Sequence, residues 1–245
     1  MKGVILAGGT GSRLKPLTLV ANKQLLPVYN KPLIYYPLNV LLKAQIKDIL
    51  IVSSPQYIGN YVRLFESGKK FGVNITYAVQ ESPDGLAHGL GLAEDFADKS
   101  PVTLILGDNI FEDDVHKAIM NFNGDGAVDF FVPVDNPEQL GCPVFDKNGN
   151  LIDIEEKPAK PQSKYGQTGL YIFDNDCFRR IKNQKPSARG ELEITDLLNT
   201  YLKEEKLKYE ILKGKWFDAG NFDALLDASN WAKEMQKKSR SYFVF

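Results

Sequence analysis

The chain has 245 residues and is 43% hydrophobic, which is enough for one large α/β domain with a substantial core. Its 30 basic and 31 acidic residues nearly balance, so the composition predicts no binding to nucleic acid or to a membrane surface, and anionic ligands must be held locally. Two cysteines are too few for a disulfide framework, no apolar run approaches the ~20 residues that cross a bilayer, and no signal peptide opens the chain, so we expect a cytoplasmic protein.

The first half alternates short β-branched runs with helical patterns. Strands are predicted near residues 2–7, 48–53, 74–79 and 102–106, and helices near 31–45, 56–67 and 86–97. Such alternation is typical of parallel strands with helices on both faces of a sheet. Because ligands of these sheets sit at the carboxyl ends of the strands, we expect the site there.

The second half is less regular. Strands are predicted in DFFVPV, CPVFD, NGNLIDIEEKP, TGLYIFD and at the end of KYEILKGKWFDAG, and a helix is predicted in ELEITDLLNTYLKEE. This pattern indicates a mixed sheet with an inserted lobe that shares the same core. The tail FDALLDASNWAKEMQKKSRSYFVF is predicted as a helix with a basic end, serving packing or oligomer contacts.

A glycine-rich turn follows the first strand. Gly8, Gly9 and Gly11 let the backbone fold tightly and bring several N–H groups close to a polyanion, an approach that a larger side chain would obstruct. Arg13 and Lys23 follow, and both are cations at neutral pH. The turn is therefore predicted to hold phosphate.

Two familiar phosphate-binding patterns do not fit this turn. A Walker A loop ends in Gly-Lys-Ser/Thr, whereas this one ends in Gly-Ser-Arg, and a dinucleotide fingerprint needs a third glycine where Leu14 stands. A nicotinamide-dependent oxidoreductase is excluded by the same glycine pattern and by the lack of an acidic ribose ligand after a second strand.

Through these residues the chain resembles the sugar-1-phosphate nucleotidylyltransferases, whose signature is GGxGxRLxPxT followed by a lysine and LPV. KQLLPVYNKPLIYYPL, with Gln24 after the lysine, is most similar to the glucose-1-phosphate thymidylyltransferases. Further blocks match in order at SPDGLA (82–87), LGDNIF (106–111), EEKP (155–158), TGLY (168–171) and PSARGELEITD (186–196). The resemblance is therefore nearly end to end.

The resemblance implies a Rossmann-like, three-layer α/β fold with a mostly parallel mixed sheet and an inserted sugar-binding lobe. The implied activity joins dTTP and glucose 1-phosphate into dTDP-glucose and pyrophosphate. It implies one nucleotidyltransferase domain over 1–245, with a nucleotide-binding part about 1–110, a sugar-binding and metal part about 111–225, and a C-terminal helix about 221–238. It also implies a homo-oligomer, a dimer or tetramer. Longer relatives carry further helices, so we expect weak or absent inhibition by dTDP-rhamnose at a second site.

Nucleotidyl transfer needs no general base, because the attacking phosphate oxygen is already ionised at neutral pH. The difficulty is electrostatic, so catalysis rests on cations, metal and alignment, and alignment alone can be worth ~7–11 kcal/mol. The resemblance assigns Arg13 and Lys23 to the nucleotide phosphates and Lys157 to the sugar phosphate, as the catalytic residues. It assigns Mg²⁺ to Asp108 and Asp218, which suits a metal that favours one or two carboxylates with phosphate oxygens and water.

The remaining assignments also follow from the resemblance. The implied nucleotide-binding residues are Leu6, Gly8, Gly9, Gly11, Ser12, Arg13, Lys23, Gln24, Gln80, Gly85 and Asp108. The implied sugar-phosphate-binding residues are Asn109, Gly141, Glu156, Lys157, Thr168 and Arg189. Gln24 and Gln80 suit the edge of a pyrimidine, because an amide offers both a donor and an acceptor.

Purely structural roles are the alternative for some of these residues. Each aspartate could cap a turn, and Ala219 stands where the family usually has threonine. Gly141 could serve only a turn, because LGCPVF departs from the aromatic-Gly-Val pattern, and Arg189 could be a cation at a helix start. His88 and His116 lack metal-ligand spacing and are interpreted as surface or helix residues.

Other functions also stay open. UTP or another hexose phosphate would suit the same residues, since the two glutamines contact an edge that uracil shares. A non-catalytic nucleotide-sugar sensor is a further possibility, against which the retained lysines, arginine and aspartates count.

Overall fold

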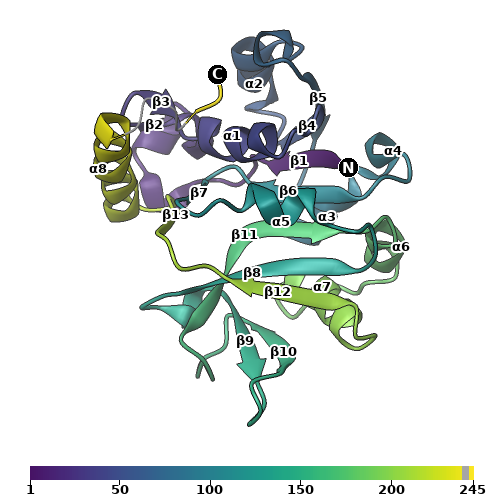
Figure 1. Ribbon diagram of the computed structural model, residues 1–245. Helices are drawn as coiled ribbons and strands as arrows, with labels where there is room; N and C mark the ends of the chain where they lie inside the picture. Colours follow the sequence, from purple (N-terminus) through teal and green to yellow (C-terminus); the bar gives the residue numbers. More distant parts are fainter. Residues whose placement is uncertain (239–242) are drawn as a thin grey trace.

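A computed structural model describes residues 1–238 and 243–245, and a seven-stranded sheet lies at the centre of this described part (Figure 1). Its strands, in spatial order, are β12 (Leu207–Ile211), β8 (Ala127–Pro133), β11 (Tyr165–Phe173), β6 (Val102–Leu106), β1 (Lys2–Leu6), β4 (Asp48–Ser53) and β5 (Asn74–Val79). Strands β6, β1, β4 and β5 pair in parallel, as do β8 and β12, whereas β11 runs antiparallel to β6 and β8. The predicted mostly parallel mixed sheet is confirmed.

Helices cover both faces of this sheet and complete the predicted three layers (Figure 1). They are α1 (Tyr35–Lys43), α2 (Ile58–Phe65), α3 (Leu86–Gly91), α4 (Glu94–Ala97), α5 (His116–Met120), α6 (Cys177–Lys182), α7 (Ile194–Leu202) and α8 (Phe222–Lys238). The core on one face is closed by α1, α2 and α5, and that on the other by α3, α6 and α7.

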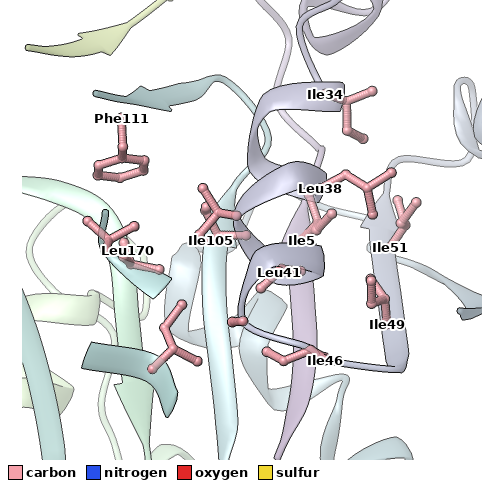
Figure 2. Close-up of a cluster of buried hydrophobic side chains, with 14 of the residues drawn as sticks. Ile5, Ile34, Leu38, Leu41, Ile46, Ile49, Ile51, Ile105, Phe111 and Leu170 are labelled. Atoms are coloured by element: carbon pink, nitrogen blue, oxygen red, sulfur yellow. The ribbon is translucent and has the colours of Figure 1, made fainter. Parts of the chain in front are cut away.

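The core under α1 shows how the sequence pattern becomes packing. Ile5 on β1 and Ile105 on β6 lie beneath Leu38 and Leu41 of the helix, and all four side chains are fully buried (Figure 2). Burying an aliphatic side chain of this size contributes about 1.5–3 kcal/mol. The cluster therefore fixes β1 and β6, whose carboxyl ends carry the glycine loop and Asp108.

Two predicted helices differ from the structure. The helix expected from residue 31 begins at Tyr35, because β2 (Pro27–Val28) and β3 (Lys31–Pro32) pair first, and the residue before a proline is disfavoured in helical conformation. The helix expected over 86–97 divides into α3 and α4, with Gly89 and Gly91 lowering helix propensity just before the break. A Cβ at Gly89 would lie 3.1 Å from Cδ2 of Leu6, so close packing on β1 favours glycine there.

Strands β9 (Gly141–Phe145) and β10 (Leu151–Glu156) form a hairpin inserted in the chain between β8 and β11, and this hairpin is the counterpart of the predicted inserted lobe. This antiparallel hairpin projects from the sheet and packs against α7 and β11 (Figure 1). A smaller antiparallel pair joins β7 (Asn109–Phe111) to β13 (Trp216–Asp218) and sets Asp218 opposite Asn109. Residues more than 100 positions apart thus meet where β6 ends.

The C-terminal helix α8 packs on β2 and β13 through Ala228, Trp231 and Ala232. The structure describes it as far as Lys238, within the bounds of about 221–238 predicted for the C-terminal helix; residues 239–242 of the tail lie outside the described residues, and 243–245 are not helical. Single 3₁₀ turns are η1 (Ser12–Leu14), η2 (Leu17–Leu19), η3 (Lys23–Leu25), η4 (Lys69–Phe71) and η5 (Pro137–Gln139). Within 1–238 and 243–245, none of the helices has the length and apolar character to cross a membrane.

Candidate active site

The glycine loop leaves β1 and turns through two left-handed residues. Gly9 has φ 93° and Gly11 has φ 58°, a region that favours glycine. A Cβ at Gly11 would also lie 2.7 Å from Cγ2 of Thr18, whose hydroxyl donates to the Gly11 carbonyl at 2.8 Å. The glycine conformations and the contact with Thr18 therefore fix the shape of the turn, and η1, with Ser12 and Arg13, follows it.

A cavity of about 240 Å³, here called the loop-side cavity, lies beside this turn. Its lining includes most of the predicted nucleotide-binding residues: Leu6, Gly8, Gly9, Lys23, Gln24, Gln80, Gly85 and Asp108. Gly11 and Ser12 are not among the lining residues, and Ser12 is exposed. The structure thus gathers the glycine loop, the strand end at Asp108 and the 80–86 segment around one space.

A second cavity of about 210 Å³, here called the lobe-side cavity, opens next to the first and reaches the β9–β10 hairpin. Its lining includes predicted sugar, phosphate and metal residues: Arg13, Lys23, Asp108, Asn109, Gly141, Glu156, Lys157, Thr168 and Asp218. Lys23 and Asp108 line both cavities. Two ligands placed one in each cavity would therefore meet at this pair.

Lys23 and Asp108 form a buried ion pair, with the lysine Nζ donating to the carboxylate Oδ2. Burial alone would lower the pKa of Lys23, but the charge and hydrogen bond of Asp108 outweigh it and leave the pKa raised. Burial likewise opposes ionisation of Asp108, and Lys23 reverses this and lowers the pKa of the carboxyl. Both groups are consequently charged at neutral pH.

Asp218 provides a second carboxylate beside this pair. Its partial burial and the negative charge of Asp108 raise its pKa to about 6. The Arg13 guanidinium lies 3.9 Å from Oδ2 of Asp218, with the arginine side chain 58% exposed and free to turn toward a ligand. Among the described residues no three His, Cys, Asp or Glu cluster to enclose a metal. Two mutually repelling carboxylates do fit Mg²⁺, which keeps phosphate and water oxygens for its other positions.

The far end of the loop-side cavity carries amide groups. Gln24 is buried, and its Nε2 donates to the Gly8 carbonyl at 3.1 Å. Nε2 of Gln80 lies 3.2 Å from the Gly85 carbonyl and 3.1 Å from Nδ1 of His88. Gly85 has φ 107°, and a Cβ there would lie 2.4 Å from the Leu192 carbonyl. The backbone at Gly85 therefore packs directly against the backbone at Leu192.

Asn109 organises the wall between the strand end and the lobe. Its Oδ1 accepts from the Gly169 N–H at 2.8 Å and from the Trp216 indole N–H at 2.7 Å. Gly141 begins β9 without a positive φ, and a Cβ there would lie 1.8 Å from Oε1 of Gln167. Close packing, rather than the turn considered above, accounts for this glycine.

Glu156 ends β10 within a network of its own. Its Oε1 accepts from Nη2 of Arg189 at 2.9 Å and its Oε2 accepts from the Thr195 hydroxyl at 3.2 Å. Nζ of Lys157 lies 3.6 Å from Glu156, and the lysine side chain is 46% exposed and lines the cavity. Arg189 also pairs with Glu193 at 2.8 Å and is not among the lining residues. It lies behind Glu156 rather than inside the cavity.

Sequence reasoning missed several residues of the site. Gln167, Tyr171 and Trp216 line the lobe-side cavity. His88 lies on helix α3, as its interpretation as a surface or helix residue allows, but its contact with Gln80 has no signal in the sequence. Trp216 could have been found from its place two residues before Asp218. The others depend on pairings between distant strands or on the turn before α3.

Comparison with known proteins places this site in context. The family model described as nucleotidyl transferase matches residues 2–234. A glucose-1-phosphate thymidylyltransferase of Neisseria meningitidis serogroup A is 45% identical over 241 residues, which cover 96% of this chain and 84% of the relative. One from Xanthomonas campestris pv. campestris strain B100 is 46% identical over 244 residues, covering 97% and 82%. A solved structure of a candidate glucose-1-phosphate thymidylyltransferase from Bacillus anthracis, in complex with sucrose, matches with a TM-score of 0.90 at 46% identity and covers 96% of each chain.

Proposed function

Because the chain belongs to the nucleotidyl transferase family, we propose that it is an enzyme that transfers a thymidylyl group from dTTP to glucose 1-phosphate, giving dTDP-glucose and pyrophosphate. The observation that carries the proposal is the pair of adjoining cavities with Lys23 and Asp108 common to both. A nucleotide in one and a sugar phosphate in the other would bring the reacting phosphates together at this pair.

The reaction forms one bond and breaks one. A phosphate oxygen of glucose 1-phosphate attacks the α-phosphorus of dTTP, and the bond from that phosphorus to the bridging oxygen breaks as pyrophosphate leaves. The nucleophile is already an anion, so no residue needs to remove a proton. The protein supplies positive charge and alignment instead.

Each cation has a place in this scheme. Lys23, held by Asp108, lies at the junction and contacts the α-phosphate, while Arg13 swings from Asp218 toward the leaving phosphates. The backbone N–H groups of the glycine loop cradle the triphosphate. Lys157 draws the sugar phosphate from the lobe side, and its half-exposed side chain has room to reach it.

The metal assignment rests on Asp108 and Asp218. Their carboxylates would hold Mg²⁺, which, when bound, neutralises phosphate charge. Without a cation, burial and the charge of Asp108 hold the pKa of Asp218 well above its ordinary value. That repulsion is relieved when a divalent ion is bound.

Recognition of the two substrates divides between the cavities. Leu6, Gln24, Gln80 and Gly85 face the base, and the glycine loop faces the sugar and phosphates of the nucleotide. On the lobe side, hydroxyls of the hexose meet Glu156, whose two oxygens are already oriented by Arg189 and Thr195. Asn109, Gly141 and Thr168 complete that wall.

A cytoplasmic location is part of the proposal, supported by nucleoside triphosphate chemistry and by two free, buried thiols, Cys142 and Cys177. The homo-oligomer expected from the sequence stays a prediction.

The test is pyrophosphate release across a matrix of dTTP, UTP, CTP, ATP and GTP against several hexose 1-phosphates. The proposal requires the highest kcat/KM with dTTP and glucose 1-phosphate. A preference for UTP would make the enzyme a uridylyltransferase, another preferred hexose would change the sugar assignment, and binding without turnover would make the protein a sensor.

A further inference from the structure

A buried polar pair lies behind the lobe-side cavity, on strands that contribute mostly apolar side chains to the core. Asp129 on β8 is fully buried, and Gln167 on β11 is 4% exposed. On the same strands Phe131, Tyr171 and Phe173 belong to the hydrophobic core of that face. Burying a carboxyl and an amide among apolar groups is costly unless they are hydrogen-bonded. The pair therefore calls for an explanation beyond packing.

The hydrogen bonds of the pair orient the glutamine amide. Nε2 of Gln167 donates to Oδ2 of Asp129 at 2.7 Å, while Oδ1 of Asp129 accepts from the Phe130 N–H at 2.8 Å. An ionised carboxylate has only acceptor oxygens, so Asp129 in this form takes the amide nitrogen of Gln167 as its partner. The amide oxygen is consequently turned away from Asp129.

That oxygen reaches the cavity. Gln167 is one of the residues that line it, and its Oε1 lies so close to Gly141 that a Cβ there would stand 1.8 Å away. Within residues 1–238 and 243–245, no hydrogen bond uses Oε1 of Gln167, although it is not among the fully buried, unpaired polar atoms. It is an oriented acceptor at the wall of a polar cavity.

The local backbone explains how the side chain arrives there. The pairing of β11 with β8 is regular at Gln167 opposite Phe131, then shifts before it resumes at Tyr171 opposite Asp129. The irregular segment holds Thr168 and Gly169, which also line the cavity. A shift of this kind re-aims side chains beside a site.

We propose that Gln167 is a specificity-determining residue for the sugar, accepting a hydrogen bond from one hydroxyl of the hexose phosphate through its amide oxygen, and that Asp129 is the positioning residue that holds this oxygen toward the cavity. This inference rests on the proposed function for its substrate class. It adds an acceptor to the cavity that Glu156 also lines. A site that binds a hydroxyl in this way discriminates strongly against the analogue that lacks it.

The experiment combines residue changes with hydroxyl deletion. Wild type, Gln167→Met and the control Gln162→Met are assayed with glucose 1-phosphate and its 2-, 3-, 4- and 6-deoxy analogues. Gln162 is an exposed glutamine bonded to Glu155 at 3.2 Å. In Gln167→Met the penalty for deleting one particular hydroxyl should shrink by roughly tenfold or more in kcat/KM, with the other positions and the KM for dTTP unchanged. The control should keep every wild-type penalty.

Asp129 is tested through the same panel. Asp129→Leu removes both acceptor oxygens, one for the Phe130 N–H and one for Gln167 Nε2, and should lose selectivity at the same hydroxyl as Gln167→Met. If the leucine variant does not fold, the Gln167→Met panel decides alone. A folded Gln167→Met with wild-type penalties at all four positions overturns the proposal.

Calorimetric affinities of the sugar phosphates, measured without nucleotide turnover, separate this inference from the function. A wild-type protein that binds glucose 1-phosphate but releases no pyrophosphate refutes the enzymatic proposal. The affinities for glucose 1-phosphate and its deoxy analogues then still test the role of Gln167. Wild-type affinities that are equal for glucose 1-phosphate and all four deoxy analogues also overturn the role of Gln167.

Discussion

The amine of Lys23 donates a hydrogen bond to the carboxylate of Asp108, so a cation expected for the nucleotide is tethered to a carboxylate expected for the metal. The two side chains come from opposite ends of the N-terminal half, one from the segment after the glycine loop and one from the end of β6. Each keeps the other ionised in a buried setting. The pair is therefore a single unit at the junction of the two cavities.

Asp108→Asn should abolish most activity. The change removes a charge from both the proposed metal site and the lysine pair, and loss of a metal clamp on a transferring phosphoryl group removes several kcal/mol of stabilisation. We expect kcat/KM to fall well over tenfold, and chelation of Mg²⁺ to abolish wild-type turnover. Asp95→Asn, at an exposed aspartate of α4, is the control. Near-normal turnover in folded Asp108→Asn would exclude the metal assignment.

Lys157→Ala and Lys23→Ala should separate kinetically. Lys157 serves the lobe-side cavity, so its loss should raise the KM for glucose 1-phosphate far more than that for dTTP, and Lys23→Ala should do the reverse. Both should also lower kcat, because the charges act in the transition state. Steady-state kinetics with each substrate varied gives the comparison, with exposed Lys160→Ala as control. The same kinetic pattern in both variants would contradict the division of roles.

The two lysine variants should also differ in stability. Lys23→Ala leaves Asp108 buried without its counter-charge, and breaking a buried pair in this way typically costs about 3–5 kcal/mol. Lys157 is half exposed and its pair with Glu156 is loose, so Lys157→Ala should change the free energy of unfolding by less than about 1 kcal/mol. Urea denaturation of both variants measures the difference. Equal destabilisation would show that the Lys23–Asp108 pair is not the buried unit described above.

Asp129 should make stability fall as the pH rises toward neutrality. Burial raises its pKa to about 7, so between about pH 4 and pH 7 the folded protein holds a proton that the unfolded chain has released, and stability drops by about 1.4 kcal/mol per pH unit from this group. Asp129→Asn cannot ionise. Its free energy of unfolding relative to wild type should therefore rise by roughly 2–3 kcal/mol between pH 5 and pH 8.

Urea denaturation across that pH range checks the prediction, with exposed Asp227→Asn as the matched control. A constant difference between wild type and Asp129→Asn would mean that Asp129 keeps an ordinary pKa in the folded protein.

The strands and most of the phosphate-side residues were predictable because their signals are local. A buried β-branched run ending in glycines fixes both β1 and the loop after it, and β4, β5 and β6 fall at the predicted residues. The split of the 86–97 helix was not predictable, since it depends on Gly89 packing against Leu6. Gln167 and Asp129 gave no signal either, because their meeting depends on the register between β11 and β8.

The end of the loop-side cavity that is proposed to bind the base carries the amides of Gln24 and Gln80, whose nitrogens already have hydrogen-bond partners within the protein. Nε2 of Gln80 is bonded to the Gly85 carbonyl and to His88, which leaves its amide oxygen as the proposed acceptor for a base. His88→Ala removes one of the two partners of that nitrogen and loosens the amide, so the variant should lose part of its preference among nucleotides while the KM for glucose 1-phosphate is kept. Competition between dTTP and UTP measures the change. A variant with wild-type nucleotide preference would leave His88 without a role in orienting Gln80.

Nucleotide preference is the sharpest consequence of this pocket. Thymine differs from uracil by one methyl group, worth about 1–3 kcal/mol in a fitted apolar site, so dTTP should exceed UTP by about 10- to 200-fold at most. A purine must displace the wall at Gly85, which lines the cavity, and it would leave the amides of Gln24 and Gln80 with mismatched partners. We therefore expect ATP and GTP close to background with glucose 1-phosphate as co-substrate. Ratios of kcat/KM for the nucleoside triphosphates test this preference. A purine triphosphate with the kcat/KM of dTTP would overturn the pocket assignment, and a higher kcat/KM for UTP than for dTTP would change the assigned substrate.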